Sequence, residues 1–250
     1  LGGNGITSPT QYLVVAYPML NGLAITDPAS GYNPNNPYAN RDPRLRNTAF
    51  HNGMLWLNRN VETFSGGADR PGGTGQQTKT GYYMRKFMGK FESANGGVYS
   101  NTIHDFIYMR YAEVLLNYAE ALNEFSGPSP EVYDVLYQLR QRAGIEQGPD
   151  NSYGIAPGLS KEQMREVLRN ERRIELAFEE HRYFDIRRWK IAETVMNQPL
   201  RGVNIQRTSS GVESFDYVQV FTPVFRAPAM YLYPVPYDEV IRNPQMQQNP

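Results

Sequence analysis

The 250-residue sequence contains no cysteine, which excludes a disulfide framework, a thiolate metal site and a cysteine nucleophile. It also has no net charge, because 25 basic side chains balance 25 acidic ones. A neutral surface lacks the field that holds a polyanion, so we expect no nucleic-acid partner. No apolar run approaches the roughly 18 residues that a membrane-spanning helix needs. These absences favour a globular protein that binds a ligand, and we expect no cofactor.

The motifs of several common active sites are missing as well. The histidines, His51, His104 and His181, form no His-x-x-x-His pair, so we expect no metal site. The glycine-rich stretch 66–75 is followed by glutamine instead of the Lys-Ser/Thr of a phosphate-binding loop. No Gly-x-Ser-x-Gly nucleophile motif is present. We therefore expect no catalytic residues, although a pair of carboxylates, as in a glycoside hydrolase, is an alternative that spacing alone does not remove.

Glycine and proline are plentiful, with 22 and 18 copies, and they divide the chain unevenly. Residues 1–105 hold most of the turn-forming clusters, so we predict long loops there with a few short strands or helical turns. Loops lie at the surface and carry binding residues more often than regular elements do. Flat rings beside amide and guanidinium groups suit a sugar, and they also suit a peptide. We therefore predict a ligand site formed by Trp56, Phe64, Tyr32, Tyr38, Asn58 and Arg59.

Residues 106–197 have the pattern of helices instead. A first amphipathic helix begins near Asp105 and stops at Gly127. Its apolar positions at helical spacing are Leu115, Tyr118, Ala119, Leu122 and Phe125. A second helix, from Ser129 or Pro130 to about Gly144, follows after so short a connection that the two predict an antiparallel pair.

A third helix begins at Ser160, which forms a capping-box pattern with Gln163, and we expect this helix to reach about Glu180. A further amphipathic segment follows over 181–196. Within it we expect Trp189 to close a core cluster of aromatic and aliphatic side chains, namely Tyr183, Phe184 and Ile186. The segment 198–250 returns to irregular structure, with one short helix at 238–242.

Glu171 lies in the middle of the apolar stripe of the third predicted helix. A carboxylate on an apolar face needs a partner, because a buried unpaired charge is very costly. The candidate partners are Arg110, Arg182 and Arg188. We interpret the surrounding charged segment as a structural ion-pair network that ties helices together, with an active-site acid as the alternative. The predicted network comprises Glu171, Arg172, Arg182, Asp185 and Arg188.

Four stretches of the chain resemble the SusD/RagB family of nutrient-binding outer-membrane lipoproteins. They are Asn40-Arg41-Asp42-Pro43-Arg44-Leu45, the run 110–124, the charged segment 171–189, and Pro234-Val235-Pro236 with Gln248-Asn249-Pro250. Their order and spacing agree with the C-terminal half of a family member over essentially the whole chain. The resemblance implies a mainly α fold of tetratricopeptide-like helix pairs, with long irregular loops and a few short strands.

The resemblance also implies how the chain is divided. Residues 1–250 would form the C-terminal region of a family member. Its parts would be a loop-rich ligand-side segment (1–105), helical pairs (106–197) and an irregular C-terminal segment (198–250). Such a region is incomplete without an N-terminal half. Because repeat-type helix pairs bury their apolar faces only against neighbours, we expect one helical face to be incompletely covered.

Family members are surface-exposed lipoproteins of the cell outer membrane that capture nutrients for import through a partner TonB-dependent transporter, and they are not enzymes. We therefore expect this chain to capture oligosaccharides. Peptide capture by the same architecture is the first alternative, and a carboxylate-dependent glycoside hydrolase is less favoured. Any membrane association would come from a lipid anchor upstream of this chain. The family's ligand aromatics follow no motif, so the six predicted ligand residues rest on their chemistry alone.

Overall fold

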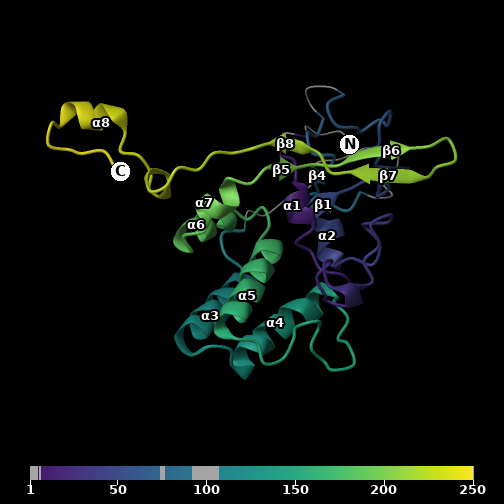
Figure 1. Cartoon of the computed structure of the whole chain (residues 1–250), viewed down its shortest axis with the longest axis horizontal. Helices are drawn as coiled ribbons and strands as arrows, with labels where there is room; N and C mark the ends of the chain where they lie inside the picture. Colours follow the sequence, from purple (N-terminus) through teal and green to yellow (C-terminus); the bar gives the residue numbers. More distant parts are fainter. Residues whose placement is uncertain (1–4, 6, 74–76, 92–106, 250) are drawn as a thin grey trace.

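The computed structural model describes residues 5, 7–73, 77–91 and 107–249. In Figure 1 the three longest helices lie together at one end of the molecule, and short strands and loops form the other end. The elements of the loop-rich segment, residues 7–91, are all short. They are α1 (Gln11–Val14), a 3-10 turn (Pro28–Ser30), α2 (Pro43–Thr48), β1 (Ala49–Phe50), β2 (Leu55–Trp56), β3 (Arg59–Asn60) and β4 (Tyr83–Met84).

The helical body consists of α3 (Tyr111–Ser126), α4 (Pro130–Ala143) and α5 (Lys161–Glu175). Pro130 begins α4 at a position where its missing N–H breaks no helical bond. Ser160 and Gln163 form the expected capping box at the start of α5. The α3–α4 pair and the capping box are therefore confirmed. The expected start of the first helix at Asp105, and His104 beside it, lie outside the described residues.

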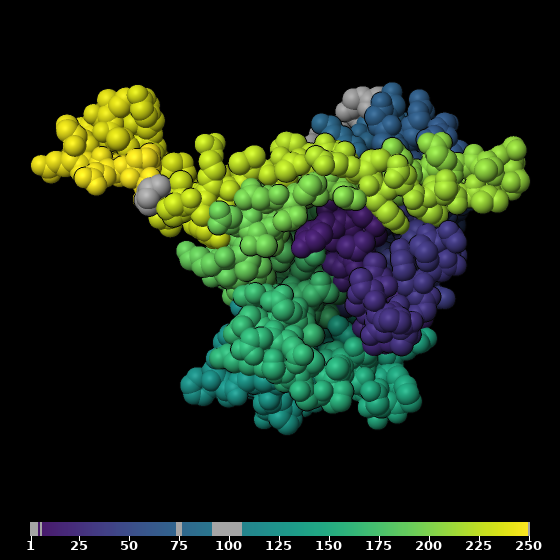
Figure 2. Space-filling model, viewed as in Figure 1, coloured from purple at the N-terminus to yellow at the C-terminus, as the bar shows by residue number. Residues whose placement is uncertain are grey.

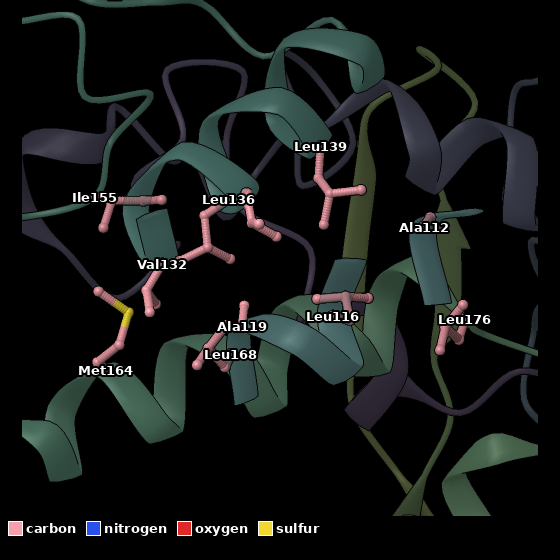
Figure 3. Close-up of a cluster of buried hydrophobic side chains, with 11 residues drawn as sticks. Ala112, Leu116, Ala119, Val132, Leu136, Leu139, Ile155, Met164, Leu168 and Leu176 are labelled. Carbon is pink, nitrogen blue, oxygen red and sulfur yellow. The ribbon is translucent and has the colours of Figure 1, made fainter. Parts of the chain in front are cut away.

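The main apolar core lies between these three helices. Figure 3 shows its side chains pointing inward from α3, α4 and α5. Leu116, Leu136 and Met164 are each at most 1% exposed. Burying a side chain of this size stabilises the fold by roughly 1.5–3 kcal/mol. The helical body therefore has a core of its own, to which Ile155 of the loop between α4 and α5 also contributes.

The helical segment beyond α5 differs from the expectation. α5 ends at Glu175 rather than near residue 180, and Phe178 and Glu180 take positive φ angles of 62° and 65° that no helix continues through. Side chains from distant parts of the chain bind the carbonyl oxygens that a longer helix would have used. Lys86 Nζ donates to the carbonyls of Glu175 and Ala177, at 3.2 and 2.9 Å. The expected segment 181–196 is likewise divided, into α6 (His181–Arg188) and α7 (Ala192–Met196).

The C-terminal segment is more regular than the sequence predicted. Its strands are β5 (Leu200–Arg201), β6 (Asn204–Arg207), β7 (Glu213–Asp216) and β8 (Gln219–Phe221), which form the antiparallel pairs β5–β8 and β6–β7. The chain then passes α6 and α7, where Phe225 is buried with Ile186 and Ala192, and leaves the body as an arm (Figure 2) that holds the expected short helix as α8 (Tyr237–Arg242). Side-chain amides close the arm on itself, because Gln248 bonds the backbone of Val235 and Asn249 that of Tyr233.

A second apolar cluster joins the loop-rich segment to the rest of the protein. Tyr17 and Leu45 from the loops pack in it with Ile174 of α5 and Ile205 of β6, and each is at most 2% exposed. The hydroxyl of Tyr17 donates to Thr48 Oγ1 at 2.9 Å and lies 3.2 Å from the carbonyl oxygen of Ile174. The loops are thus fixed to α5 by both packing and hydrogen bonding.

The described part of the chain contains no helix that is both long and apolar enough to cross a bilayer.

Candidate functional site

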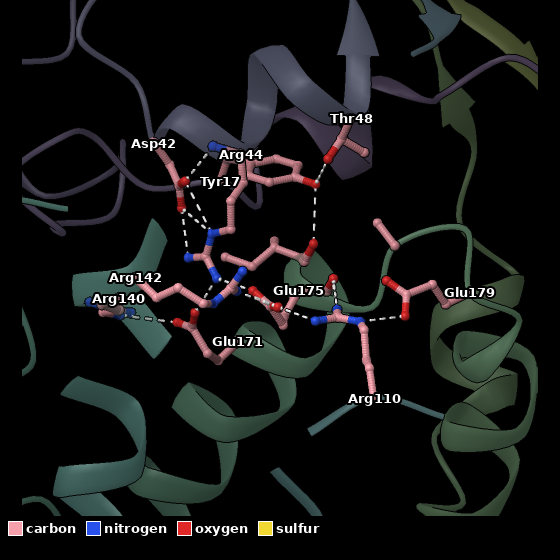
Figure 4. A network of polar contacts seen from close by, with 12 residues as sticks. Tyr17, Asp42, Arg44, Thr48, Arg110, Arg140, Arg142, Glu171, Glu175 and Glu179 are labelled. Atoms are coloured by element: carbon pink, nitrogen blue, oxygen red, sulfur yellow. Dashed lines mark hydrogen bonds and ion pairs between the residues drawn. The ribbon is translucent and has the colours of Figure 1, made fainter. Parts of the chain in front are cut away.

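The most highly charged part of the structure surrounds Glu171, whose side chain is completely buried (Figure 4). Its Oε1 accepts a hydrogen bond from Arg44 Nη1 at 2.6 Å, and its Oε2 accepts one from Arg140 Nε at 3.0 Å. Burial alone would raise the pKa of Glu171, but the two guanidinium groups hold it below its usual value. The partners come from α2 and α4, so the expectation that Arg110, Arg182 or Arg188 pairs with this acid is wrong.

One turn further along α5, Glu175 collects a second set of cations. It accepts from Arg44 at 2.8 Å, from Arg110 at 2.6 Å and from Arg142 at 2.5 Å. Arg110 also pairs with Glu179 at 2.6 Å. Burial would raise the pKa of Glu175 and of Glu179, yet the surrounding cations lower both. These acids stay ionised and paired, which suits a structural role and not a proton donor.

Tight backbone packing positions Arg140 within this network. Its Nη1 donates to the carbonyl oxygens of Gly22 and Tyr153, at 3.1 and 2.8 Å. Gly22 has a φ of 81°, and a Cβ there would lie 1.9 Å from the Tyr153 oxygen, so only glycine fits. Arg140 therefore links α4, α5 and two loops in one contact set.

Three of the other predicted network residues, Arg172, Asp185 and Arg188, form a separate group. Arg172 Nε donates to Asp185 Oδ2 at 2.7 Å, and Arg188 Nε donates to Oδ1 of the same acid at 2.9 Å. Arg188 also binds Glu120 of α3. Arg182 forms no ion pair with any residue that the structure describes. The charged residues thus form two groups, one around Glu171 and Glu175 of α5 and one around Asp185 of α6, and Arg182 makes an ion pair in neither.

The cluster expected around Trp189 is not a core. Ile186 is 3% exposed, but Tyr183 and Phe184 are 41% and 56% exposed. Trp189 is half-buried, and its Nε1 donates to Glu120 Oε1 at 2.6 Å. Only Ile186 therefore behaves as the sequence indicated.

Trp56 cannot stack on a ligand, because its side chain is 1% exposed. The Trp56 ring packs edge-on against Phe50, with 4.8 Å between the two ring centroids. The guanidinium carbon of Arg85 lies 5.7 Å from the centroid of the Trp56 ring. The prediction of this residue as a surface platform is wrong, since the β2–β3 hairpin turns the ring inward. The sequence indicates that Trp56 is an aromatic residue in a loop-rich region, but it does not indicate whether the hairpin directs the ring toward solvent or toward the interior.

Tyr38 and Phe64 are half-buried in the second apolar cluster. The ring of Tyr38 stacks on His51, with 4.0 Å between centroids and 14° between planes. The ring of Phe64 is covered by the guanidinium of Arg207, 3.9 Å from the centroid. Each of these two rings therefore has a neighbour within the protein where a sugar would stack.

Asn58 and Arg59 lie exposed at the β2–β3 turn. Arg59 forms a two-pronged ion pair with Asp69, with nitrogen–oxygen distances of 2.7 and 2.8 Å. Burial of Asp69 would raise its pKa, but this pair and a backbone hydrogen bond lower it. The guanidinium of Arg59 is thus committed to holding the 66–73 loop, and the six predicted ligand residues do not form one site.

Tyr32 is the predicted ligand residue that lies beside a cleft. The cleft has a volume of about 300 Å³ and is lined by Met19, Leu20, Asn21, Ser30, Gly31, Asn40 and Glu146. Tyr32 follows this lining directly in the chain, is half-buried, and donates from its backbone N–H to Ser30 Oγ at 3.3 Å. We call this surface the Tyr32 cleft.

The Tyr32 cleft offers polar groups with unused hydrogen-bonding capacity. The side chains of Asn40 and Glu146 make no hydrogen bond to another described residue, whereas the amide of Asn21 bonds Ser30 O and Leu23 N–H. Backbone hydrogen bonds hold the two sides together, from Leu20 N to Asn40 O at 2.7 Å and from Glu146 N to Leu20 O at 2.8 Å. Sequence analysis missed these residues because Glu146 comes from a loop more than a hundred residues later.

A second cleft, of about 240 Å³, lies beside the ion-pair network. Arg44, Lys86, Arg110 and Glu175 are among its lining residues. Each side-chain nitrogen of Lys86 and Arg110 already donates to a carboxylate or a carbonyl of the protein. Little capacity is left for a ligand, so the Tyr32 cleft is the better candidate. No group of three or more His, Asp or Glu side chains among the described residues could hold a metal ion.

Comparison with known proteins defines the class of protein to which this fold belongs. The model of the SusD family matches residues 1–250. A SusD-like protein from Bacteroides fragilis superposes with a TM-score of 0.73 at 29% identity, over 97% of this chain and 46% of its own. A SusD-like carbohydrate binding protein from the same organism gives a TM-score of 0.72 at 28% identity, over 96% of this chain and 48% of its own.

A curated relative, SusD-like protein P2 of Formosa agariphila, is 37% identical over 157 residues, which are 63% of this chain and 27% of that protein. This chain therefore belongs to the SusD family, and its mainly α fold with tetratricopeptide-like helix pairs is confirmed. It spans about half the length of the solved relatives and matches about a quarter of the curated one.

Proposed function

We propose that the protein containing this chain binds nutrients at the cell surface, capturing oligosaccharides for import through a partner TonB-dependent transporter. It would act as a surface-exposed lipoprotein of the outer membrane. The observation that carries the proposal is the likeness to a SusD-like carbohydrate binding protein over 96% of the chain. No bond is made or broken in this function.

The Tyr32 cleft supports oligosaccharide as the ligand. A sugar presents an apolar C–H face that packs on an aromatic ring and hydroxyl groups that both donate and accept. We propose that the ring of Tyr32, which follows the lining residues Ser30 and Gly31 in the chain and has the Arg41 guanidinium carbon 5.7 Å from its centroid, supplies the apolar contact. The Glu146 carboxylate and the Asn40 amide would supply acceptors and a donor at the cleft. An open cleft of this kind binds a segment of a long polymer weakly at each point, which suits capture followed by release.

The acids of the network argue against hydrolysis. A glycoside hydrolase needs one carboxyl group that is protonated near neutral pH beside a second that is ionised. Glu171, Glu175 and Glu179 all have pKa values below the usual one, because cations surround them. We therefore propose that the protein is not an enzyme.

Calorimetric titration of the full-length protein against oligosaccharides and oligopeptides tests this function, with each ligand chromatographed before and after incubation. We expect saturable sugar binding without cleavage. Tyr32→Ala should weaken binding about tenfold, since one well-placed ring contributes roughly 0.5–1.5 kcal/mol beyond its buried area.

Asn58→Ala is the matched control for Tyr32→Ala, because it removes another predicted and exposed ligand residue from the β2–β3 turn. It should leave the sugar affinity unchanged. An equal loss in both variants would contradict the Tyr32 cleft as the site. Binding of peptides alone would replace the sugar with a peptide ligand, and cleavage products would contradict the binding function itself.

A further inference from the structure

The surface where α6 packs against α5 carries three arginines with few acids to balance them. Arg169 and Arg173 lie four residues apart on α5, so their side chains share one face of that helix. Arg182 lies in the first turn of α6, is half-buried, and makes neither a hydrogen bond nor an ion pair with any residue that the structure describes. We call these three residues the arginine cluster.

Contacts between α5 and α6 define how the arginine cluster is assembled. Asp185 of α6 binds Arg172 of α5 at 2.7 Å. Trp189 follows Asp185 by four residues, and its ring centroid lies 4.9 Å from the guanidinium carbon of Arg169. The two segments therefore run antiparallel where they meet. Arg182 precedes Asp185 by one turn, so it lies toward the C-terminal end of α5.

Arg173 lies at that end of α5 and has like charges for neighbours. Its guanidinium carbon lies 3.9 Å from the ring centroid of Tyr12, and its Nη2 donates to the Tyr12 carbonyl oxygen at 2.5 Å. Burial, and after it the charge of Arg182, lower the pKa of Arg173 from 12.5 to about 10. Burial also lowers the pKa of Arg182, and the charge of Arg169 adds to this effect. The three guanidinium groups therefore repel one another across a partly buried surface.

The acids near the arginine cluster do not neutralise it. Glu166 binds Arg169 Nη1 at 3.0 Å, but its side chain is 71% exposed, and a pair this exposed contributes little. Asp185 is already shared by Arg172 and Arg188. The Nε of Arg169 is buried and donates to no described atom. The cluster thus has an excess of positive charge and N–H donors that the described residues leave unused.

Other buried arginines of the protein have their charges or donors satisfied. Arg140 and Arg172 are each 6% exposed, and both bind a carboxylate. Arg41 binds no acid, but its guanidinium donates to the carbonyl oxygens of four residues. Withdrawing a charge from water without such partners is costly. The arginine cluster differs from these cases, and an anion from solution would supply the missing partner.

We propose that the arginine cluster binds a tetrahedral oxyanion of the sulfate type, either as a free ion or as an ester group on a larger ligand. Guanidinium groups donate paired, charge-assisted hydrogen bonds to the oxygens of such anions. A carboxylate offers two oxygens in one plane, whereas guanidinium groups from two helices suit oxygens that point in different directions. The ring of Tyr12, which is 45% exposed beside Arg173, would contact the group that carries the ester. The cluster shares no residue with the Tyr32 cleft.

Calorimetric titration of the full-length protein with sodium sulfate tests the site, at an ionic strength held constant with sodium chloride. We expect saturable binding with a Kd on the order of 1 mM. Arg182→Gln should weaken it about tenfold, because it removes one charged donor group. Arg242→Gln is the matched control, since Arg242 is exposed on α8, away from α5 and α6 (Figure 1), and it should bind sulfate like the parent. Equal affinities in the two variants, or no binding by the parent, would overturn the proposal.

Stability measurements separate an anion site from a purely structural role of the arginines. Without sulfate, Arg182→Gln should keep or raise the urea midpoint of unfolding, because it removes a repelling charge. Sulfate should raise the midpoint of the parent and of Arg242→Gln, but not that of Arg182→Gln. A lower midpoint of Arg182→Gln without sulfate would assign Arg182 to the fold and overturn the proposal. The same rise with sulfate in all three proteins would overturn it as well.

A sulfated oligosaccharide and its desulfated form distinguish the two sources of the anion. If the sulfated form binds more tightly than inorganic sulfate, and Arg182→Gln removes the difference between the sulfated and desulfated forms, the ligand group is an ester. If inorganic sulfate binds as tightly as the sulfated form, the ligand is the free ion, and the cluster is supported in either case. Binding of the desulfated form is tested by Tyr32→Ala, so failure of the sulfate titration leaves the proposed function untouched.

Discussion

Polar side chains in the ion-pair network are buried and fully hydrogen-bonded, whereas those of Asn40 and Glu146 in the Tyr32 cleft are exposed and bond no other described residue. Glu171 is completely buried and accepts from two arginines, whereas Glu146 is exposed and bonds no other described side chain. Both are glutamates, so residue type does not separate them. The difference teaches that saturation of hydrogen-bonding capacity distinguishes a structural group from a binding group.

The largest effect is expected from Glu171→Gln. The neutral amide would leave Arg140 without its buried counter-charge and would remove one of the three acids paired with Arg44, and breaking such a buried pair destabilises a protein by roughly 3–5 kcal/mol. Urea unfolding of the full-length variant measures the loss. Glu166→Gln is the control, because Glu166 is 71% exposed in a surface pair with Arg169 and should contribute about 0.5 kcal/mol or less. Similar losses in the two variants would show that burial of the pair does not matter.

A second effect is a pH dependence that comes from His51, which lies outside both regions and stacks on Tyr38. Burial lowers the pKa of His51 from 6.5 to about 4. Between these two pH values His51 is therefore protonated in the unfolded chain and neutral in the folded protein. Stability is then fully present above about pH 6.5 and falls as the pH drops toward 4, by about 3 kcal/mol in total. His51→Phe keeps a ring against Tyr38 but cannot titrate. Its unfolding free energy should therefore stay level between pH 6.5 and 5, and a slope like that of the parent protein would refute this assignment.

The network responds in a more acidic window. The lowered pKa values of Glu171, Glu175 and Glu179 mean that their contribution is present above the pKa of an unfolded glutamate, about 4.3. It is lost as the pH falls through their folded values. The pH dependence that remains in His51→Phe should therefore begin only below about pH 4.5.

The smallest effect is expected from Glu146→Ala in the Tyr32 cleft. Removing one hydrogen-bonding partner of a sugar hydroxyl costs about 1 kcal/mol, or about a fivefold loss of affinity by calorimetry. The unfolding free energy should change by less than about 0.5 kcal/mol, because the side chain is exposed and unpaired in the fold. A large loss of stability with no loss of affinity would place Glu146 with the structural acids.

Local sequence predicted the elements whose causes are local. The capping box at Ser160 and the proline start of α4 need only residues within one turn, and both are present. The end of α5 was missed because Lys86, about 90 residues earlier, binds the Glu175 and Ala177 carbonyls. Such a contact leaves no mark in the helix itself.

The candidate site shows the same limit. A loop aromatic is recognisable in the sequence, but whether its ring faces water depends on how the loop folds back, as the difference between buried Trp56 and half-buried Tyr32 shows. The buried charge of Glu171 was visible from its place in an apolar stripe. Its partner Arg44 was not, since nothing near Arg44 in the chain indicates a role 127 residues away.

That separation has a consequence for the order of folding. Arg44 joins α2 to α5 through Glu171 and Glu175, at sequence separations of 127 and 131 residues. During synthesis at about 5–20 residues per second, the loop-rich segment must wait roughly 6–25 s for these acids to be made. Contacts this distant in sequence also slow folding, because the entropic cost of closing a long loop comes before the ion pairs with Glu171 and Glu175 can form. The early part of this chain is therefore expected to stay unfolded until α5 has emerged, and to need protection from aggregation during that interval.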